Sequence, residues 1–312
     1  MTIQGLSRFI RRTKAFAPHL HRMFLTNKEV DILPRMEGKK ALVDGACAFY
    51  GFKYSRKSTA SRRSDSARDM AEQFASAHLR LQETMKFSDI CVVWDGKERH
   101  PMKATKKKNN SRNTQFYAER KTRDPIFDEV DHYVQQMGIQ TFTAPFDAEL
   151  HASYCSLADS IKRRNVESVV VSNDYDCLAT GAPLTLRNPF SAEMIMSGEN
   201  KNWIHGVHVV DQKSVLDAMR MNQFQFQDFC ILLGCDFLSK PTFMRNIGPK
   251  DIAALIREHG SIEKIIMNFV IPGRRVVPDS LNDYLKRVNI VRNLMHRDDL
   301  IRTFDNFNKS EY

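Results

Sequence analysis

Three short apolar runs that each stop at an aspartate constrain the fold of this chain more than any other feature of its sequence. They are Lys40–Asp44, Asp89–Asp95 and Glu167–Asp174. Each run is too short for a helix, contains β-branched residues and has few polar positions, which indicates a strand buried on both faces. Strands of this kind belong to parallel sheets that helices cover on both sides.

Apolar residues with helical spacing lie between these runs. One such helix face carries Met70, Phe74, Ala77, Leu81 and Met85. This spacing predicts an amphipathic helix over 67–86, and similar patterns predict helices over 126–137 and 148–161. The alternation of strands and helices predicts an α/β domain over 1–210, with a mostly parallel central sheet flanked by helices.

The pattern changes after residue 210, where we find helices and loops but no convincing strand. Helices are predicted over 212–220, 223–233, 249–259, 261–269 and 279–296. Residues 211–312 are therefore expected to form a second, helical region.

Two polar stretches interrupt the α/β pattern. Residues 53–68 are rich in Ser, Arg and Lys and are predicted to form a solvated loop. Residues 97–123 contain ten Lys or Arg against two Glu, interleaved with Phe116 and Tyr117. Taken alone, this second stretch is equally typical of a solvated basic helix or loop.

Net charge, apolar runs and cysteine spacing indicate the kind of partner and the environment of this protein. The formal net charge of +10 favours a polyanion such as nucleic acid, although charge alone does not identify one. No apolar run reaches the roughly 20 residues of a membrane span, so we expect no membrane contact. The six cysteines are scattered without a C-x-x-C pair, which indicates reduced packing residues of an intracellular protein.

Acidic residues gather near the predicted strand ends. In open α/β sheets ligands bind beyond the carboxyl ends of the strands, so the aspartates at these ends are expected to converge. Other acids lie nearby in sequence, and the full set is Asp44, Asp95, Asp147, Glu149, Asp174, Asp176 and Asp236. Taken alone, the acids at 147 and 149 could cap a helix, and those at 174 and 176 would suit a sugar-nucleotide transferase.

Seven carboxylates in one place would raise one another's pKa values by repulsion. Divalent cations relieve that repulsion, and hard oxygen ligands suit Mg²⁺ or Mn²⁺. Two such ions about 4 Å apart can clamp the attacking and leaving oxygens of a phosphoryl displacement. An acidic pocket within a basic protein is the charge layout expected of a metal-dependent nuclease.

A glycine–proline turn opens one of the predicted C-terminal helices. It reads Asn246-Ile-Gly248-Pro249-Lys250. Backbone N–H groups at such a helix start, together with Lys250, can receive a DNA phosphate. A plain turn between two helices is the alternative.

Six blocks in a fixed order resemble the flap endonuclease family of structure-specific 5′ nucleases, which includes related exonucleases, repair nucleases and junction resolvases. The blocks are residues 1–6, 41–45, 93–97, 144–149, 172–178 and 231–236, and the 247–250 turn follows them. The resemblance extends from residue 1 to about 270. It implies a PIN-like nuclease core and a C-terminal helix–hairpin–helix-type DNA-binding region with its hairpin at 246–261.

The resemblance implies hydrolysis of phosphodiester bonds in branched DNA, as a 5′ flap endonuclease and 5′–3′ exonuclease in replication, repair or recombination. It also implies two Mg²⁺ ions, with Mn²⁺ as a substitute, bound by the seven carboxylates. The implied catalytic residues are Asp44, Asp95, Glu149, Asp174 and Lys103.

The resemblance further implies residues that contact DNA. Tyr50 corresponds to an aromatic residue that stacks on a base, with a core tyrosine as the alternative reading. Within 97–123, which resembles a helical arch, Lys103 best fits the lysine that orients the phosphate, and Lys107 or Arg112 could serve as its arginine. Gly248 and Lys250 belong to the hairpin, where a K⁺ ion is implied.

The chain departs from the family pattern at several positions. Thr2 and Asn246 replace glycines, Asp147 replaces a glutamate, and extra residues separate Asp236 from the hairpin. The segment from Asp95 to Asp147 is short for a full arch and cap. No sliding-clamp motif is recognisable at 301–312. These differences suit a compact member, such as a viral one, and we expect a monomer.

The cellular location depends on the source, which the sequence does not state. We expect a nuclear protein in a eukaryote or eukaryotic virus and a cytoplasmic one otherwise. The first 28 residues are basic and lack acids, as in a mitochondrial transit peptide, but the match at residues 3–6 argues against their removal.

Two other functions remain open at this point. One is an RNA-cleaving endonuclease of the same family, of the host-shutoff type, which would require 2′-hydroxyl contacts. The other is a non-catalytic nucleic-acid-binding module, although a binding surface alone would work better without seven acids.

Overall fold

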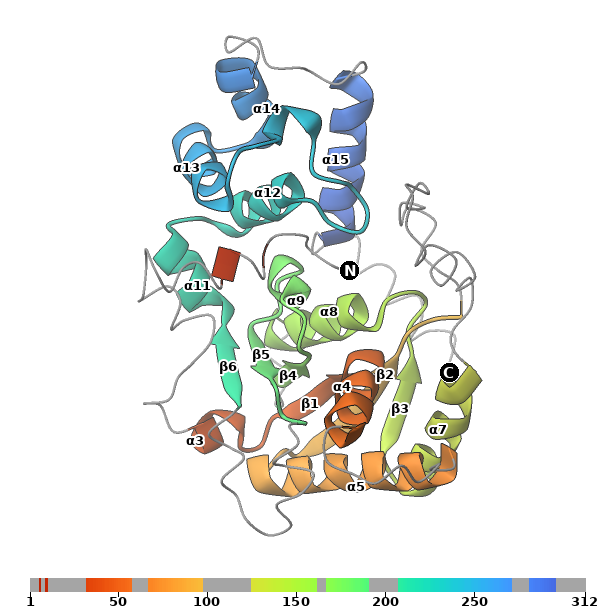
Figure 1. Cartoon of the computed structure of the whole chain (residues 1–312). Coiled ribbons are helices and arrows are strands. Elements are labelled where there is room, and N and C mark those ends of the chain that lie inside the picture. The colour runs from red at the N-terminus through yellow and green to blue at the C-terminus, as the bar shows by residue number, and fades with distance from the viewer. Residues whose placement is uncertain are drawn as a thin grey trace.

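The described residues build a six-stranded sheet with the strand order β3-β2-β1-β4-β5-β6 (Figure 1). The computed structural model describes residues 6, 9–10, 32–57, 67–97, 125–161, 167–190, 207–270 and 281–295. The strands are β1 (Lys40–Asp44), β2 (Asp89–Trp94), β3 (Gln140–Thr143), β4 (Ser168–Val171), β5 (Leu184–Arg187) and β6 (His208–Asp211). Only β6 runs antiparallel to its neighbour, which confirms the mostly parallel sheet predicted from the sequence.

The three predicted strands form the centre of this sheet. β1 lies between β2 and β4, and Lys40 is in register with both Asp89 and Ser168. The parallel direction brings the ends of all three strands to one edge. Asp44 is the last residue of β1, Asp95 follows β2, and Asp174 lies in the turn after β4.

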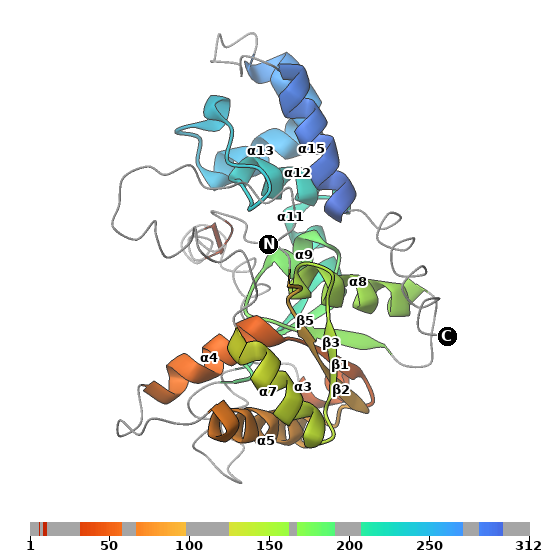
Figure 2. The same cartoon turned by 90° about the vertical axis from the view of Figure 1, so that its right-hand side faces the viewer.

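Helices cover both faces of the sheet (Figure 1, Figure 2). On one face lie α4 (Gly45–Lys57), α5 (Ala67–Met85) and α7 (Pro125–Gln136), and on the other lies α8 (Ala148–Ile161). Side chains alternate along β1, as strand geometry requires. Val43 packs in the cluster that contains Phe74 of α5, whereas Leu42 packs in the cluster that contains Ala152 of α8.

An aromatic cluster anchors the end of β2. The Trp94 ring stacks on Phe127 at a centroid distance of 5.3 Å and lies 6.0 Å from Phe74. Its indole Nε1 donates a hydrogen bond of 2.7 Å to Asp131, which satisfies the polar atom of a fully buried side chain. Because Trp94 directly precedes Asp95, this packing fixes the backbone position from which the Asp95 side chain extends.

Beyond Asp211, the described residues form helices and loops, as predicted. The helices are α11 (Gln212–Met219), α12 (Gln223–Leu233), the 3₁₀ turn η2 (Thr242–Met244), α13 (Pro249–His259), α14 (Ile262–Ile265), the π-helical segment η3 (Ile266–Val270) and α15 (Leu281–Met295). One apolar core joins these helices to Leu150, Leu178 and Val210 of the sheet region. The division into domains at residue 210 therefore stays a prediction.

Two local expectations were wrong, and two short elements were missed. Residues 53–57 continue α4 instead of starting a loop, because Phe49 and Phe52 bind that helix to the core. The helix predicted over 261–269 changes to a π-helical segment after Ile265. Short elements at α3 (Ile32–Met36) and α9 (Asp176–Ala179) were not predicted at all.

An ion-pair network holds the C-terminal helices together. Arg292 of α15 donates through Nε and Nη2 to the carboxylate of Asp228 on α12, each at 2.7 Å. Through Nη1 and Nη2 it also donates to Glu263 of α14, at 2.6 and 3.0 Å. Asp228 accepts a further bond of 3.0 Å from the backbone N–H of Ile262. One guanidinium thus links three helices.

Two sequence expectations concern the chain as a whole. All six cysteines lie in the described residues and are free thiols, as predicted. In the described part of the chain, no helix combines the length and apolar character that crossing a membrane requires.

Candidate active site

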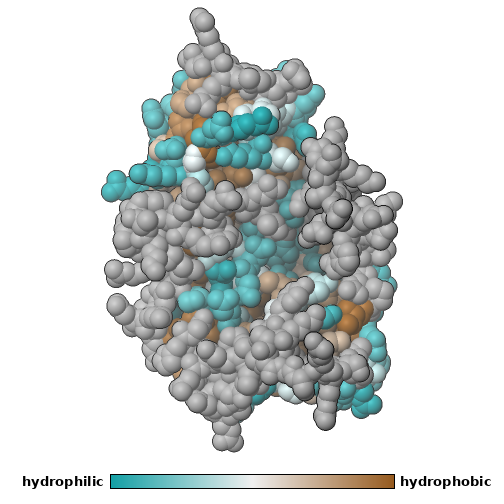
Figure 3. Space-filling model, viewed as in Figure 1, coloured by the Kyte–Doolittle hydropathy of each residue, from teal (hydrophilic) through white to brown (hydrophobic). Residues whose placement is uncertain are grey.

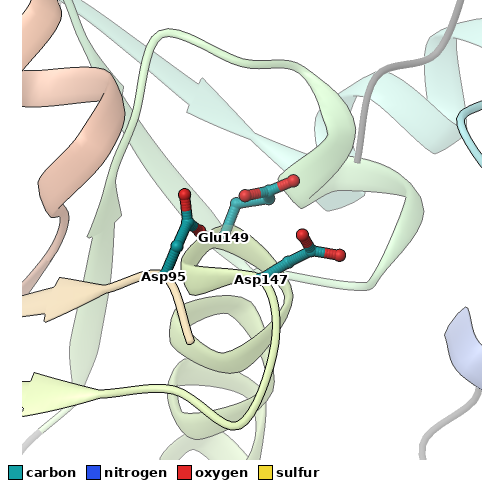
Figure 4. Close-up of side chains that lie close together, drawn as sticks. All are labelled: Asp95, Asp147 and Glu149. Atoms are coloured by element: carbon teal, nitrogen blue, oxygen red, sulfur yellow. The ribbon is translucent and has the colours of Figure 1, made fainter. Parts of the chain in front are cut away.

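A hydrophilic recess lies between the helical part and the α/β part in the view of Figure 3. One acidic group in the described residues consists of Asp95, Asp147 and Glu149, and one carboxylate oxygen of each lies within 4.8 Å of the others (Figure 4). Asp95 follows β2, and the other two flank the start of α8. The backbone N–H of Ala148 donates to Asp95 Oδ1 at 2.8 Å, so Asp95 binds a free N–H group at the start of α8.

Asp44 occupies the centre of the carboxyl edge and is only 4% exposed. Its two oxygens accept hydrogen bonds from the backbone N–H of Cys47 at 3.1 Å and from Ser172 Oγ at 2.9 Å. Burial and the charge of Asp95 nevertheless raise the pKa of Asp44 to about 7. A bound cation would therefore stabilise the ionised form of Asp44 in this buried position.

Ser172 connects Asp44 to Asp174. Its Oγ donates to Asp44 and accepts a hydrogen bond of 3.1 Å from the backbone N–H of Asp174. Asp174 in turn accepts a bond of 3.0 Å from the N–H of Tyr175. Burial and the charge of Asp236 raise the pKa of Asp174. The carboxylate after α12 therefore lies within electrostatic range of the sheet edge.

The pKa of the Cys177 thiol is affected by three of the predicted carboxylates. Burial raises its pKa, and the charges of Asp44, Asp174 and Asp176 raise it further. Asp176, at the start of α9, is 1% exposed. Its charge and that of Asp236 also add to the effect of burial on Cys235, whose pKa rises to about 11.

The seven predicted carboxylates therefore lie in one connected region. The group at 95, 147 and 149 joins the remaining acids through Asp44, and Asp174 reaches Asp236. The donors are all carboxylate oxygens, which suit Mg²⁺ or Mn²⁺. Their roles as metal ligands and catalytic groups stay predictions. Asp147, shorter than the glutamate expected there, still reaches the group.

Two residues of this region were missed because their roles depend on contacts between distant segments. The first is Ser172. The second is Arg187 at the end of β5, whose guanidinium lies 3.4 Å from the centre of the Tyr175 ring. Its Nη2 donates to the carbonyl of Asn173 at 2.5 Å. Arg187 thus contacts both residues that flank Asp174. The sequence did not indicate this role, because β5 was not predicted and a single arginine forms no motif.

The predicted DNA contacts at Tyr50, Lys103, Lys107 and Arg112 stay predictions. Tyr50 is half-buried, and its ring makes edge contacts with Phe49 and Phe127 at 6.1 and 5.6 Å, so it packs against the core while base stacking stays a prediction. Lys103, Lys107 and Arg112 lie outside the described residues, as does most of the 97–123 segment.

The hairpin has the local geometry that the sequence predicted. Gly248 is the N-cap of α13 with φ −74° and ψ 160°, Pro249 starts the helix, and Lys250 is exposed in the first turn. Asn246 adopts a left-handed conformation with φ 68°. Asparagine tolerates this conformation better than most residues, so its replacement of glycine leaves the turn intact.

Comparison with known proteins was made in sequence and in structure. A family model described as the XPG I-region matches residues 138–236, a range that contains five of the seven acids. Flap endonuclease 1 of Mycosarcoma maydis is 33% identical over 150 residues, which cover 48% of this chain and 36% of that protein. Flap endonuclease 1 of Homo sapiens is 34% identical over 153 residues, which cover 49% and 36%. The match therefore spans about a third of the length of these relatives.

Two solved structures share the fold over most of the chain. Flap endonuclease-1 from Methanococcus jannaschii has a TM-score of 0.57 at 22% identity and covers 86% of this chain and 81% of its own. The catalytic core of Rad2 in complex with DNA substrate has a TM-score of 0.55 at 16% identity and covers 84% and 75%. The comparisons lead to one conclusion: residues 138–236 match the XPG I-region, part of the chain is similar in sequence to flap endonuclease 1, and most of the chain shares the fold of these solved structures.

Proposed function

We propose that this protein is a Mg²⁺-dependent, structure-specific 5′ nuclease that cuts branched DNA at 5′ flaps and degrades 5′ ends as an exonuclease. The observation that carries the proposal is the connected set of carboxylates at the carboxyl edge of the sheet, with three of them within 4.8 Å. The XPG I-region match and the similarity to flap endonuclease 1 support it.

The residues around the carboxylates position them for this chemistry. Bound divalent ions would activate water and stabilise the leaving 3′ oxygen. Ser172 and the Cys47 N–H orient Asp44, the Ala148 N–H orients Asp95, and Arg187 holds the turn around Asp174. This preorganisation leaves little motion to restrict when the substrate arrives.

DNA would be held by basic groups outside the acidic region. Lys250 and the backbone N–H groups at the start of α13 are suited to a phosphate of the duplex. The basic 97–123 segment is the proposed contact for the flap, through Lys103 with Lys107 or Arg112. The Rad2 structure that shares this fold was solved in complex with DNA substrate.

Cleavage of a labelled 5′-flap duplex is the direct test. We expect cutting near the flap junction in Mg²⁺ and none in EDTA, because the carboxylates need a cation to act. A flap of matched RNA sequence and a blunt duplex serve as controls. Degradation of RNA alone would replace the proposal by the RNA-cleaving alternative. No cutting of any substrate, with binding retained, would favour the non-catalytic module.

Gly96 offers a test of how the site is spaced. A Cβ at this position would lie 2.2 Å from the carbonyl oxygen of Pro145, and the Gly96 N–H donates to Phe146 at 2.6 Å. We expect Gly96→Ala to displace the loop before Asp147 and to lower single-turnover flap cleavage by about 10²-fold. The accompanying loss of stability should be about 1–3 kcal/mol.

Gly51→Ala is the matched control for this change. Gly51 lies within α4, and a Cβ there would have Asn173 as its nearest neighbour, at an ordinary 3.8 Å. Alanine also favours a helix over glycine, so cleavage should persist and stability should hold or rise. Full activity in Gly96→Ala would show that the spacing of Asp95 and Asp147 tolerates a shift of the loop.

A further inference from the structure

The ammonium group of Lys240 contacts the hairpin turn at residues 246–250. Lys240 Nζ donates a hydrogen bond of 2.7 Å to the carbonyl oxygen of Ile247. Ile247 is 8% exposed and directly precedes Gly248, the N-cap of α13. The bond therefore brings an ammonium group to the turn that the proposed function assigns to duplex binding.

The backbone fixes Lys240 in this place. Gly234, which ends α12 with φ 91°, comes so close to residue 240 that a Cβ on it would lie 2.7 Å from the Lys240 nitrogen. The Cys235 N–H donates to the carbonyl of Leu238 at 2.8 Å, which closes the loop between these two residues. The end of α12 therefore fixes the backbone position of Lys240, from which its side chain extends.

The turns that follow Lys240 bring Ile247 back to the lysine. After Lys240 the chain forms η2, in which Met244 N–H bonds to the Pro241 carbonyl at 3.0 Å. Ile247 N–H then bonds to the Met244 carbonyl at 3.1 Å. These two turns reverse the chain and direct the Ile247 carbonyl toward the side chain of Lys240.

The charges around the turn favour an anion. The start of α13 carries the positive end of the helix dipole, and Gly248 has no side-chain cap. Arg245 and Lys250, on either side, are exposed. The carboxylate near Gly248 belongs to Asp251, in the first turn of α13. Burial lowers the pKa of Lys240, as expected where a cation leaves water.

The K⁺ ion that the family resemblance implies does not fit this turn. An alkali ion must collect several oxygen atoms at once, and the Ile247 carbonyl already accepts from an ammonium. A second cation beside the first would be repelled. The segment between Asp236 and the hairpin therefore places a tethered cation where the resemblance implied a free one.

We propose that the Lys240 ammonium is the built-in cation of the hairpin, so that duplex binding there does not depend on K⁺. The proposal rests on the proposed function in one respect, because it assigns DNA as the anion. A phosphate that approaches the start of α13 would be attracted by Lys240 together with Lys250 and the positive end of the dipole of that helix.

The test measures binding of a fluorescent 5′-flap duplex by anisotropy in EDTA, with K⁺ or Na⁺ at equal concentration. Wild type should bind equally in both salts. Lys240→Met should bind several-fold more weakly in Na⁺, with a salt slope smaller by about 1, and should recover affinity in K⁺. Lys213→Met, which removes an exposed lysine of α11, is the control for the lost charge and should show no preference for K⁺.

A second variant separates charge from folding. Lys240→Gln keeps a donor for the Ile247 carbonyl, so its melting temperature should stay near that of wild type while its binding becomes sensitive to K⁺. Several-fold tighter binding of wild type in K⁺ than in Na⁺ would overturn the proposal. So would wild-type affinity in both Lys240 variants.

A readout without DNA keeps this proposal separate from the proposed function. Crystals of wild type and Lys240→Met soaked in RbCl would be compared by anomalous scattering. We expect a peak at the Ile247 carbonyl in the variant and none in wild type. A peak in wild type would refute the tethered cation, whereas absence of DNA binding with the expected peaks would refute only the assignment of DNA.

Discussion

Asp174→Asn is expected to reduce single-turnover cleavage of a 5′ flap by at least about 10³-fold, or about 4 kcal/mol of transition-state stabilisation. The asparagine retains the shape of the side chain and can still accept from the Tyr175 N–H, but it removes a charged oxygen from the site. Metal ions bound by carboxylates supply stabilisation of this size in phosphoryl transfer.

The same variant should remain folded. Burial and the charge of Asp236 both raise the pKa of Asp174, so neutralising it relieves repulsion, and the melting temperature without metal should hold or rise. Mg²⁺ should raise the melting temperature of wild type more than that of the variant, since a ligand stabilises the state it binds. Asp217→Asn on α11, an exposed acid paired with Lys213, is the control and should cleave normally. Undiminished cleavage in Asp174→Asn would remove that residue from the site.

Arg292→Met is expected to lower the free energy of unfolding by about 3–5 kcal/mol, the largest stability effect we predict. The side chain of Asp228 is 4% exposed, and loss of the guanidinium would leave a buried carboxylate with the Ile262 N–H as its remaining hydrogen-bond donor among the contacts described above. Urea unfolding at neutral pH would measure the change. Arg287→Met, on an exposed position of the same helix, should change stability by no more than about 0.5 kcal/mol.

The effect of Arg292→Met should also depend on pH. Hydrogen bonds from Arg292 lower the pKa of Glu263 from 4.5 to about 2. A depressed pKa in the folded state stabilises the fold above the ordinary value and loses that contribution as pH falls toward the folded value. The difference in stability between wild type and variant should therefore shrink from pH 4.5 to pH 2. A constant difference across this window would show that Glu263 gains nothing from the pair.

The central strands could be predicted because burial on both faces makes them continuous apolar runs. β3, β5 and β6 could not, since each has four residues and retains polar positions, as in Gln140–Thr143 and Leu184–Arg187. α4 was missed for another reason: it begins at Gly45, where a Cβ would lie 2.6 Å from the Trp94 ring. Glycine there is a requirement of tertiary packing, which local propensity does not reveal.

The carboxylates could be predicted because topology alone brings strand ends together. The groups that orient them could not, since the bond from Ser172 to Asp44 joins residues that are 128 positions apart. Lys240 is a similar case, because its role depends on how η2 returns the chain to the hairpin.

The thiol of Cys177 has a consequence for how the protein withstands oxidation. Cysteine reacts with oxidants and alkylating agents as the thiolate, and this thiol is buried beside three carboxylates that disfavour a further negative charge. Cys47, next to Asp44 and Asp174, has a pKa raised to about 12 for the same reasons, burial first. The negative field that suits the site to divalent cations thus also disfavours ionisation of these two thiols while no cation is bound, which slows their reaction with oxidants and alkylating agents.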